Sequence, residues 1–191
     1  MHTRLWLVSH APTAAMRAGR FPSDDPLDAR GIADAHAFRV RLDVPHDAIA
    51  FVSPAVCTRE TADALGLAAQ TAPALADMDY GRWHGRRIAD VAADDNDASA
   101  LSAWTVDPEA VVPDGESFAE VAARVARWLD AIANVPAVPA VVAVTHAVVI
   151  RAALVHALQT ALGAGMRIEI GPLSRVELRR STLGWVWWPA A

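Results

Sequence analysis

Two short apolar segments that each lead into a histidine constrain the fold of this chain more than any other feature. Residues 4–8 form the first segment, and His10 follows it after a single serine; residues 140–145 form the second and run directly into His146. Each segment has the length and apolar character of a strand buried on both faces of a sheet. Because ligands bind beyond the carboxyl ends of the strands in open α/β sheets, we expect the two histidines to face one pocket.

Helical and extended patterns alternate along the rest of the chain. Helices are predicted at about 28–42, 55–65, 117–133 and 147–161, and further strands at about 48–52, 72–75, 175–178 and 185–188. The helix that begins at Ser117 carries a capping-box pattern, since Glu120 follows three residues later. The alternation predicts a three-layer α/β/α sandwich with a mostly parallel central sheet, in which the last two strands pair as an edge hairpin.

The length of 191 residues suits one domain with a full-sized core, so we expect a single domain over residues 1–191. The stretch at about 76–116 is irregular, and we interpret it as an insertion over the pocket. Its acidic run at 94–97 is expected to be a solvated loop. Residues 135–139, which contain two prolines, are expected to be a rigid connector.

Charge and composition exclude several classes of function. The formal net charge is −5 and all 17 basic residues are arginines, so there is no basic surface for nucleic acid, and anions must be bound by guanidinium groups, backbone amides or histidines. No apolar stretch approaches the roughly 20 residues that span a bilayer. The single cysteine, Cys57, precludes an internal disulfide. We expect a cytoplasmic protein without membrane contact; a homodimer is left open.

Six short motifs then occur in the order found in the histidine phosphatase superfamily, which includes the phosphoglycerate mutases. They are VSHAPT at 8–13, the segment 19–31 with Asp25-Pro26-Leu27, SP at 53–54 with TAD at 61–63, LADMDYGRWHG at 75–85, DGES at 114–117 and THA at 145–147. The chain resembles this superfamily over nearly its whole length. The resemblance implies a phosphoglycerate mutase-like fold.

The resemblance also implies a phosphomonoesterase. In that family the first histidine attacks the phosphorus atom and forms a phosphohistidine, so His10 would be the nucleophile. Asp77 would protonate the leaving oxygen, at a position where the family usually has glutamate, and His146 would help to bind the phosphoryl group. No cofactor is implied, and the expected ligand is a small phosphorylated metabolite or another anion.

Two positions depart from the family pattern. The family has an arginine directly before the nucleophile and another four residues ahead of a Thr-Ala pair, and this chain has Ser9 and Cys57 there. Because phosphoryl transfer depends on neutralising the phosphoryl oxygens, we expect weak or altered hydrolysis from a degenerate phosphate pocket. The ligand-binding candidates, which include the start of the last predicted helix, are Ser9, Thr13, Arg17, Arg20, Cys57, Arg82 and Ala147. Arg86 is a further cation placed to swing in.

Two alternatives stay open. The chain could be a non-catalytic pseudophosphatase that binds an anionic ligand or a protein partner through the same pocket. It could also hold a metal ion, since His10, Cys57, Asp77 and His146 are all transition-metal ligand types, although their spacing matches no known metal signature.

Overall fold

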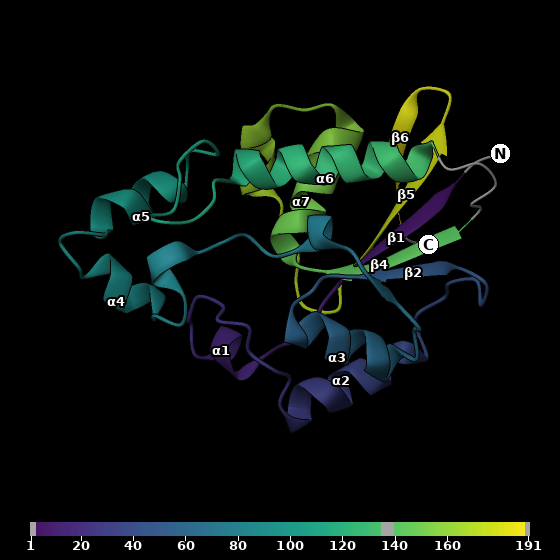
Figure 1. The fold of residues 1–191 in the computed structure, drawn as a ribbon, viewed down its shortest axis with the longest axis horizontal. Coiled ribbons are helices and arrows are strands. Elements are labelled where there is room, and N and C mark those ends of the chain that lie inside the picture. Colours follow the sequence, from purple (N-terminus) through teal and green to yellow (C-terminus); the bar gives the residue numbers. More distant parts are fainter. Residues whose placement is uncertain (1–2, 135–139, 190–191) are drawn as a thin grey trace.

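The computed structural model describes residues 3–134 and 140–189, and at its centre lies a six-stranded sheet (Figure 1). The strands are β1 (Arg4–Ser9), β2 (Ile49–Val52), β3 (Gln70–Thr71), β4 (Ala140–Thr145), β5 (Arg175–Ser181) and β6 (Gly184–Trp188). Their spatial order is β3-β2-β4-β1-β5-β6. The first four are parallel to one another. Strand β5 pairs antiparallel with β1, and β6 pairs antiparallel with β5, which confirms the predicted edge hairpin.

Helices cover both faces of the sheet. In Figure 1, α2 (Ala29–Arg39) and α3 (Val56–Leu65) lie below it, and α6 (Phe118–Ala133) and α7 (Ala147–Leu158) lie above it. Successive side chains of a strand point to opposite faces. Accordingly, Leu5 and Leu7 of β1 belong to the same apolar cluster as α6 and α7, while Trp6 and Val8 belong to the cluster that contains α3. The predicted three-layer α/β sandwich is confirmed.

The ends of the helices follow local sequence signals. The Ser117 hydroxyl accepts a hydrogen bond from the Glu120 backbone N–H and the Glu120 carboxylate accepts one from Ser117 N–H, so the capping box is present. Helix α3 ends at Gly66, whose φ of 75° suits a residue without a Cβ atom. Helix α7 ends at Leu158, three residues earlier than predicted, because Gln159 adopts the left-handed conformation with φ of 50°.

Two local predictions are wrong. The strand expected at 72–75 lies earlier and is only two residues long, at Gln70–Thr71. Pro73 begins a 3-10 turn over Pro73–Leu75 instead, because proline cannot donate to a strand ladder. The loop expected after β1 also contains a short helix, α1 (Ala14–Arg17), which the Thr13 hydroxyl caps.

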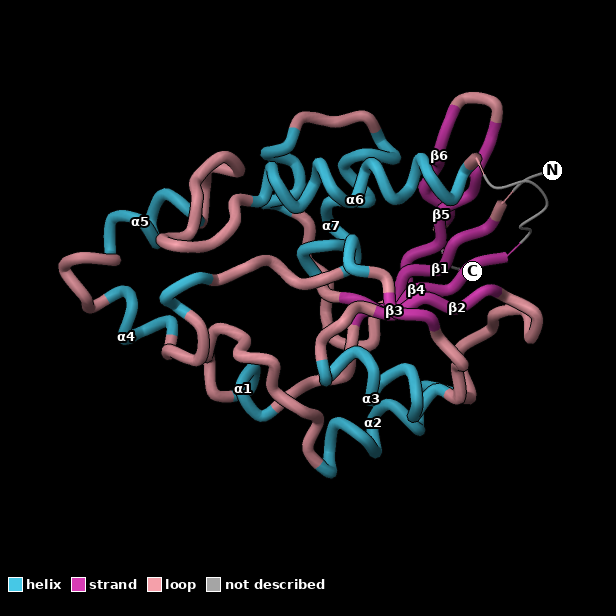
Figure 2. Tube along the Cα trace, viewed as in Figure 1, coloured by secondary structure: helices cyan, strands magenta, loops and turns pink. Residues whose placement is uncertain are grey.

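The segment at 76–116 extends beyond the carboxyl ends of the parallel strands, and much of it is loop (Figure 2). It contains the 3-10 turn Gly81–Trp83 and the helices α4 (Ile88–Ala92) and α5 (Ala98–Trp104). Its aromatic side chains pack against the loop after β1, since the Phe21 ring lies 5.2 Å from Trp83 and 5.8 Å from Trp104. This packing joins the irregular segment to the start of the chain.

The acidic run at 94–97 is not simply a solvated loop. Asp97 is only 2% exposed, and its carboxylate accepts hydrogen bonds from Arg82 and Arg86 at 2.6–3.0 Å. The run therefore anchors the segment that precedes it. The connector predicted at 135–139 lies outside the described residues. Among the described helices, none is both long and apolar enough to cross a membrane.

Candidate active site

The two strand-terminal histidines meet, as the sequence predicts. Strands β1 and β4 are neighbours with Ser9 opposite Thr145, and the His10 N–H donates to the Thr145 carbonyl at 2.9 Å. The ring centroids of His10 and His146 lie 5.1 Å apart at an angle of 61°. Both rings line a cavity of about 180 Å³ beyond the carboxyl ends of the strands.

The structure brings together only part of the predicted residue set. The predicted residues that line this cavity are His10, Thr13, Arg20, Cys57, Asp77 and His146. Ser9, Arg17, Arg82 and Ala147 do not line it. Ala147 is the first residue of α7, which His146 precedes as the N-cap residue.

His10 is held with one ring nitrogen available to a ligand. Its Nδ1 lies 2.8 Å from the Ala11 carbonyl oxygen. Because a carbonyl can only accept, Nδ1 carries the proton and Nε2 carries the lone pair. Burial lowers the pKa of His10 below its ordinary value of 6.5, and the neighbouring His146 lowers it further. The ring is therefore neutral near pH 7, which is the form that a nucleophile or a metal ligand requires.

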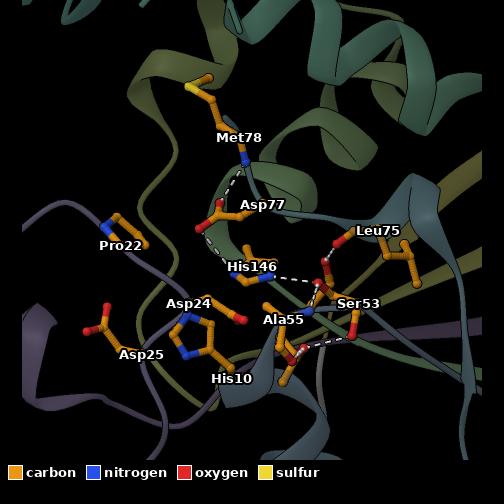
Figure 3. A network of polar contacts seen from close by, with 12 residues as sticks. His10, Pro22, Asp24, Asp25, Ser53, Ala55, Leu75, Asp77, Met78 and His146 are labelled. Atoms are coloured by element: carbon orange, nitrogen blue, oxygen red, sulfur yellow. Dashed lines mark hydrogen bonds and ion pairs between the residues drawn. The ribbon is translucent and has the colours of Figure 1, made fainter. Parts of the chain in front are cut away.

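His146 is buried and lies between two oxygen atoms (Figure 3). Its Nε2 is 2.8 Å from the Ser53 hydroxyl, and its Nδ1 is 3.3 Å from Asp77 Oδ2. Burial alone would raise the pKa of Asp77, but His146 and His10 outweigh it and the pKa falls below 3.8. Asp77 is thus an ionised carboxylate beside both histidines rather than a solvated loop residue.

Cys57 enters the cavity from the first turn of α3. The Thr61 hydroxyl donates to the Cys57 carbonyl and accepts from the Ala11 N–H, so it ties this turn to the chain that follows His10. Burial raises the pKa of the Cys57 thiol to about 12, and the carboxylate of Asp77 adds to the effect. Without a bound cation the side chain is a protonated thiol.

The Ser9 side chain forms hydrogen bonds within the protein and does not line the cavity. It is 2% exposed, and its hydroxyl donates to the Gly171 carbonyl at 2.5 Å and accepts from the Ser174 N–H at 3.0 Å. Ser9 therefore joins β1 to the turn before β5. A larger side chain here would lose both hydrogen bonds.

The arginines supply less positive charge than the sequence suggests. Arg20 lines the cavity, but it is exposed and its guanidinium donates to the Gly85 carbonyl at 2.9 Å. Arg17 forms an ion pair with Asp28.

Arg82, one of the predicted ligand-binding residues, lies outside the cavity lining and is engaged in ion pairs. The Arg82 guanidinium pairs with Asp97, and Arg86 pairs with both Asp94 and Asp97. The buried carboxylate of Asp97 and the half-buried carboxylate of Asp94 hold these cations in the irregular segment, and neither arginine lines the cavity.

Four further residues of the site were not selected as site residues from the sequence. Asp24, Asp25 and His84 also line the cavity (Figure 3 labels the first two), and Ser53 orients His146 from behind. The Asp24 carboxylate accepts from the Val56 N–H at 2.7 Å, which ties the loop after β1 to α3. Asp25, Ser53 and His84 stand within the family motifs, and Ser53 also directly follows a strand of the same sheet, so these were the available signals.

Comparisons with known proteins identify the family and the fold. The model of the histidine phosphatase superfamily (branch 1) matches residues 5–188. The adenosylcobalamin/alpha-ribazole phosphatase of Salmonella typhimurium is 31% identical in an alignment of 134 residues that covers 66% of this chain and 65% of that enzyme. The crystal structure of the alpha-ribazole phosphatase from Shigella flexneri aligns with a TM-score of 0.85 at 23% identity, covering 97% of this chain and 95% of the other.

A mycobacterial glucosyl-3-phosphoglycerate phosphatase aligns with a TM-score of 0.82 at 21% identity, covering 98% and 97% of the two chains. These likenesses in structure show the same fold, and the residues matched by the family model include both strand-terminal histidines. The chain belongs to the histidine phosphatase superfamily.

Proposed function

We propose that this protein is a phosphomonoester hydrolase of weak or altered activity that acts through a phosphohistidine on His10. The observation that carries the proposal is the state of the His10 ring. Its Nδ1 is bonded to the Ala11 carbonyl, so a neutral Nε2 with a free lone pair lies in a cavity that also holds His146 and Asp77. These are the parts that covalent phosphoryl transfer needs.

The reaction would proceed in two displacements. The His10 Nε2 lone pair attacks the phosphorus atom, the ester P–O bond breaks, and the leaving oxygen takes a proton from Asp77. Water then attacks the phosphohistidine, the P–N bond breaks, and the water proton returns to Asp77. His146, which Ser53 orients through Nε2, would donate from Nδ1 to a phosphoryl oxygen.

Two features support a low rate. Asp24, Asp25 and Asp77 place three carboxylates around the cavity against one exposed arginine, Arg20. A phosphoryl group gains transition-state stabilisation mainly from positive charge at its oxygens. The lowered pKa of Asp77 also leaves little of the protonated acid at neutral pH.

Trapping the phosphohistidine tests the proposal. Protein denatured in alkali during turnover of a phosphate-ester panel should gain one phosphoryl group by intact mass, because phosphohistidine survives base. The panel should include alpha-ribazole phosphate, in view of the relatives. His10→Ala should lose both the adduct and turnover, whereas His36→Ala, an exposed histidine of α2, should retain both. Turnover that survives His10→Ala would refute the mechanism.

The scarcity of positive charge that argues for a low rate also supports a second function, a binding protein without catalysis. In that case neither wild type nor His10→Ala would turn over any ester or form the adduct. A phosphate or vanadate ion would nevertheless raise the melting temperature of the wild type.

A further inference from the structure

We propose that His10, Cys57 and His146 form a binding site for a zinc-type divalent cation, with three protein ligands and one open position. The candidate ligand atoms, one from each side chain, all lie within 4.8 Å of one another. They come from three separate elements, namely the end of β1, the first turn of α3 and the end of β4. The site is therefore assembled by the tertiary fold.

The two imidazoles each have a nitrogen to offer. Nδ1 of His10 is taken by the Ala11 carbonyl and Nε2 of His146 lies against the Ser53 hydroxyl. The remaining nitrogens are Nε2 of His10 and Nδ1 of His146. The latter is buried in a side chain only 4% exposed and has no hydrogen-bond partner among the described residues.

Asp77 suits this arrangement as a neighbour of the cation rather than as a ligand. Its Oδ2 is 3.3 Å from His146 Nδ1 without the geometry of a hydrogen bond, and Asp77 is not part of the three-residue cluster. Nδ1 can face this carboxylate with a proton on it, as in the hydrolase scheme above, or with a metal cation in place of that proton. A metal ion on Nδ1 would satisfy both atoms.

The charge of the cavity favours a cation. Three carboxylates, those of Asp24, Asp25 and Asp77, line it together with Arg20, the one arginine in the described lining. The ligand types select the metal, because two imidazoles and a thiol suit zinc and similar borderline-soft ions rather than magnesium or calcium. On binding, the thiol would release its proton to solvent and coordinate as the thiolate.

The distances require only a small contraction. Zinc bonds of about 2.0–2.1 Å to nitrogen and 2.3 Å to sulfur in a tetrahedron place ligand atoms roughly 3.3–3.8 Å apart. In the structure, one candidate ligand atom from each of the three side chains lies within 4.8 Å of the other two. Side-chain rotations of about 1 Å would close the site, and a water molecule or a substrate atom would occupy the fourth position.

Metal binding has a consequence that depends on the proposed function. The cation would use the same His10 nitrogen that attacks phosphorus. Zinc and a phosphate ester would therefore compete, and zinc would inhibit any phosphohistidine formation.

Metal titration of protein without a polyhistidine tag tests the site. Apo protein should bind one Zn²⁺ by calorimetry, and Co²⁺ should produce a thiolate-to-cobalt charge-transfer absorbance. Cys57→Ala and Cys57→Ser should lose this band and weaken Zn²⁺ binding by more than the roughly 10–100-fold that loss of an outer-shell partner costs. His156→Gln, whose side chain pairs with Asp130 outside the cavity, should bind zinc like the wild type.

The outcomes separate the two proposals. Substoichiometric zinc, a cobalt complex without the thiolate band, or Cys57→Ala binding as tightly as wild type would each overturn the metal site. If a phosphohistidine forms in such a protein, the proposed hydrolase stands without the metal. Stoichiometric, Cys57-dependent zinc binding in a protein that never forms the adduct would support the metal site and overturn the hydrolase.

Discussion

At the scale of single residues, the cavity holds a neutral histidine suited to nucleophilic attack but few positive charges that would stabilise a phosphoryl dianion. His10 has a defined tautomer, a lowered pKa and an open Nε2. Across from it, Cys57 contributes a protonated thiol where the family pattern suggests an arginine. Ser9 occupies the other such position, but its hydroxyl is bonded within the protein. The two positions are therefore not equivalent targets for restoring charge.

Cys57→Arg should increase phosphatase activity. A guanidinium at this position would reach the cavity from α3 and could donate to phosphoryl oxygens. Hydrogen bonds to charged groups contribute about 1.5–3 kcal/mol, so kcat/KM should rise roughly 10- to 150-fold. Steady-state kinetics on the best ester of the panel measures this rise.

Cys57→Met is the control for that variant, since it adds length without charge. The gain should also disappear in the double variant with His10→Ala. Equal rates for the methionine and arginine variants would show that charge at this position is not what limits the reaction.

If Asp77 is the general acid, the hydrolysis rate should depend on pH differently for alkyl and aryl phosphate esters. The pKa of Asp77 is lowered, so the protonated acid is lost as pH rises, and hydrolysis of an alkyl phosphate should decline from mildly acidic to mildly alkaline solution. An aryl ester such as p-nitrophenyl phosphate needs no proton on its leaving oxygen and should show no such decline. Parallel pH–rate profiles for the two esters would exclude Asp77 as the acid.

Substitution of Asp77 provides a second test of its role as the general acid. Asp77→Asn should lower the alkyl phosphate rate by about 10²–10⁴-fold, the usual contribution of a general acid. The aryl ester should lose much less.

At the scale of elements, the irregular segment is held by ion pairs with a buried carboxylate. Arg82 follows the glycine that begins a 3-10 turn, Arg86 precedes α4, and Asp97 precedes α5. The carboxylate therefore connects three short elements that have few regular hydrogen bonds among them. Because this segment also carries Asp77, Met78 and His84 into the cavity, the ion pairs help to shape the site.

Asp97→Asn should lower the free energy of unfolding by about 1–3 kcal/mol, since it removes charge-assisted hydrogen bonds from a buried acceptor. Urea denaturation followed by tryptophan fluorescence measures the loss. Asp95→Asn, an exposed aspartate two residues earlier, should change stability by no more than about 0.5 kcal/mol. Similar values for the two variants would mean that the ion pairs contribute nothing to stability.

At the scale of the whole molecule, one sheet separates two apolar layers. Strands β1 and β4 contribute alternate side chains to each layer, so neither layer can form without them. We expect the chain to unfold as one cooperative unit, in keeping with a single domain.

Leu7→Ala and Leu65→Ala, on opposite faces of the sheet, test whether the two apolar layers unfold together. Both side chains are at most 4% exposed, Leu7 in the layer of α6 and α7 and Leu65 in that of α3. Each substitution should cost about 2–5 kcal/mol and shift a single transition that circular dichroism and fluorescence report alike. Leu183→Ala, in the exposed hairpin turn, is the control. Separate transitions for the two layers would contradict a single domain.

The sequence by itself determined the strands, the main helices and the meeting of His10 with His146. These inferences depend on local signals, namely runs of buried residues, a capping box, and the rule that parallel strands end at one edge of a sheet. Two predicted element bounds were wrong because of local turn conformations. Pro73 begins a 3-10 turn where a strand was predicted, and the left-handed Gln159 ends α7 early.

Only the tertiary structure decided which charges reach the site. Arg82 carries the same charge as Arg20, yet a buried carboxylate that lies 15 residues along the chain keeps it away. Asp24 and Asp25 enter through an irregular loop that has no periodic pattern. Cys57, a metal-ligand type in the sequence, comes close to both histidines only because β1, α3 and β4 converge. Such contacts depend on distance in space, which hydrophobic periodicity does not encode.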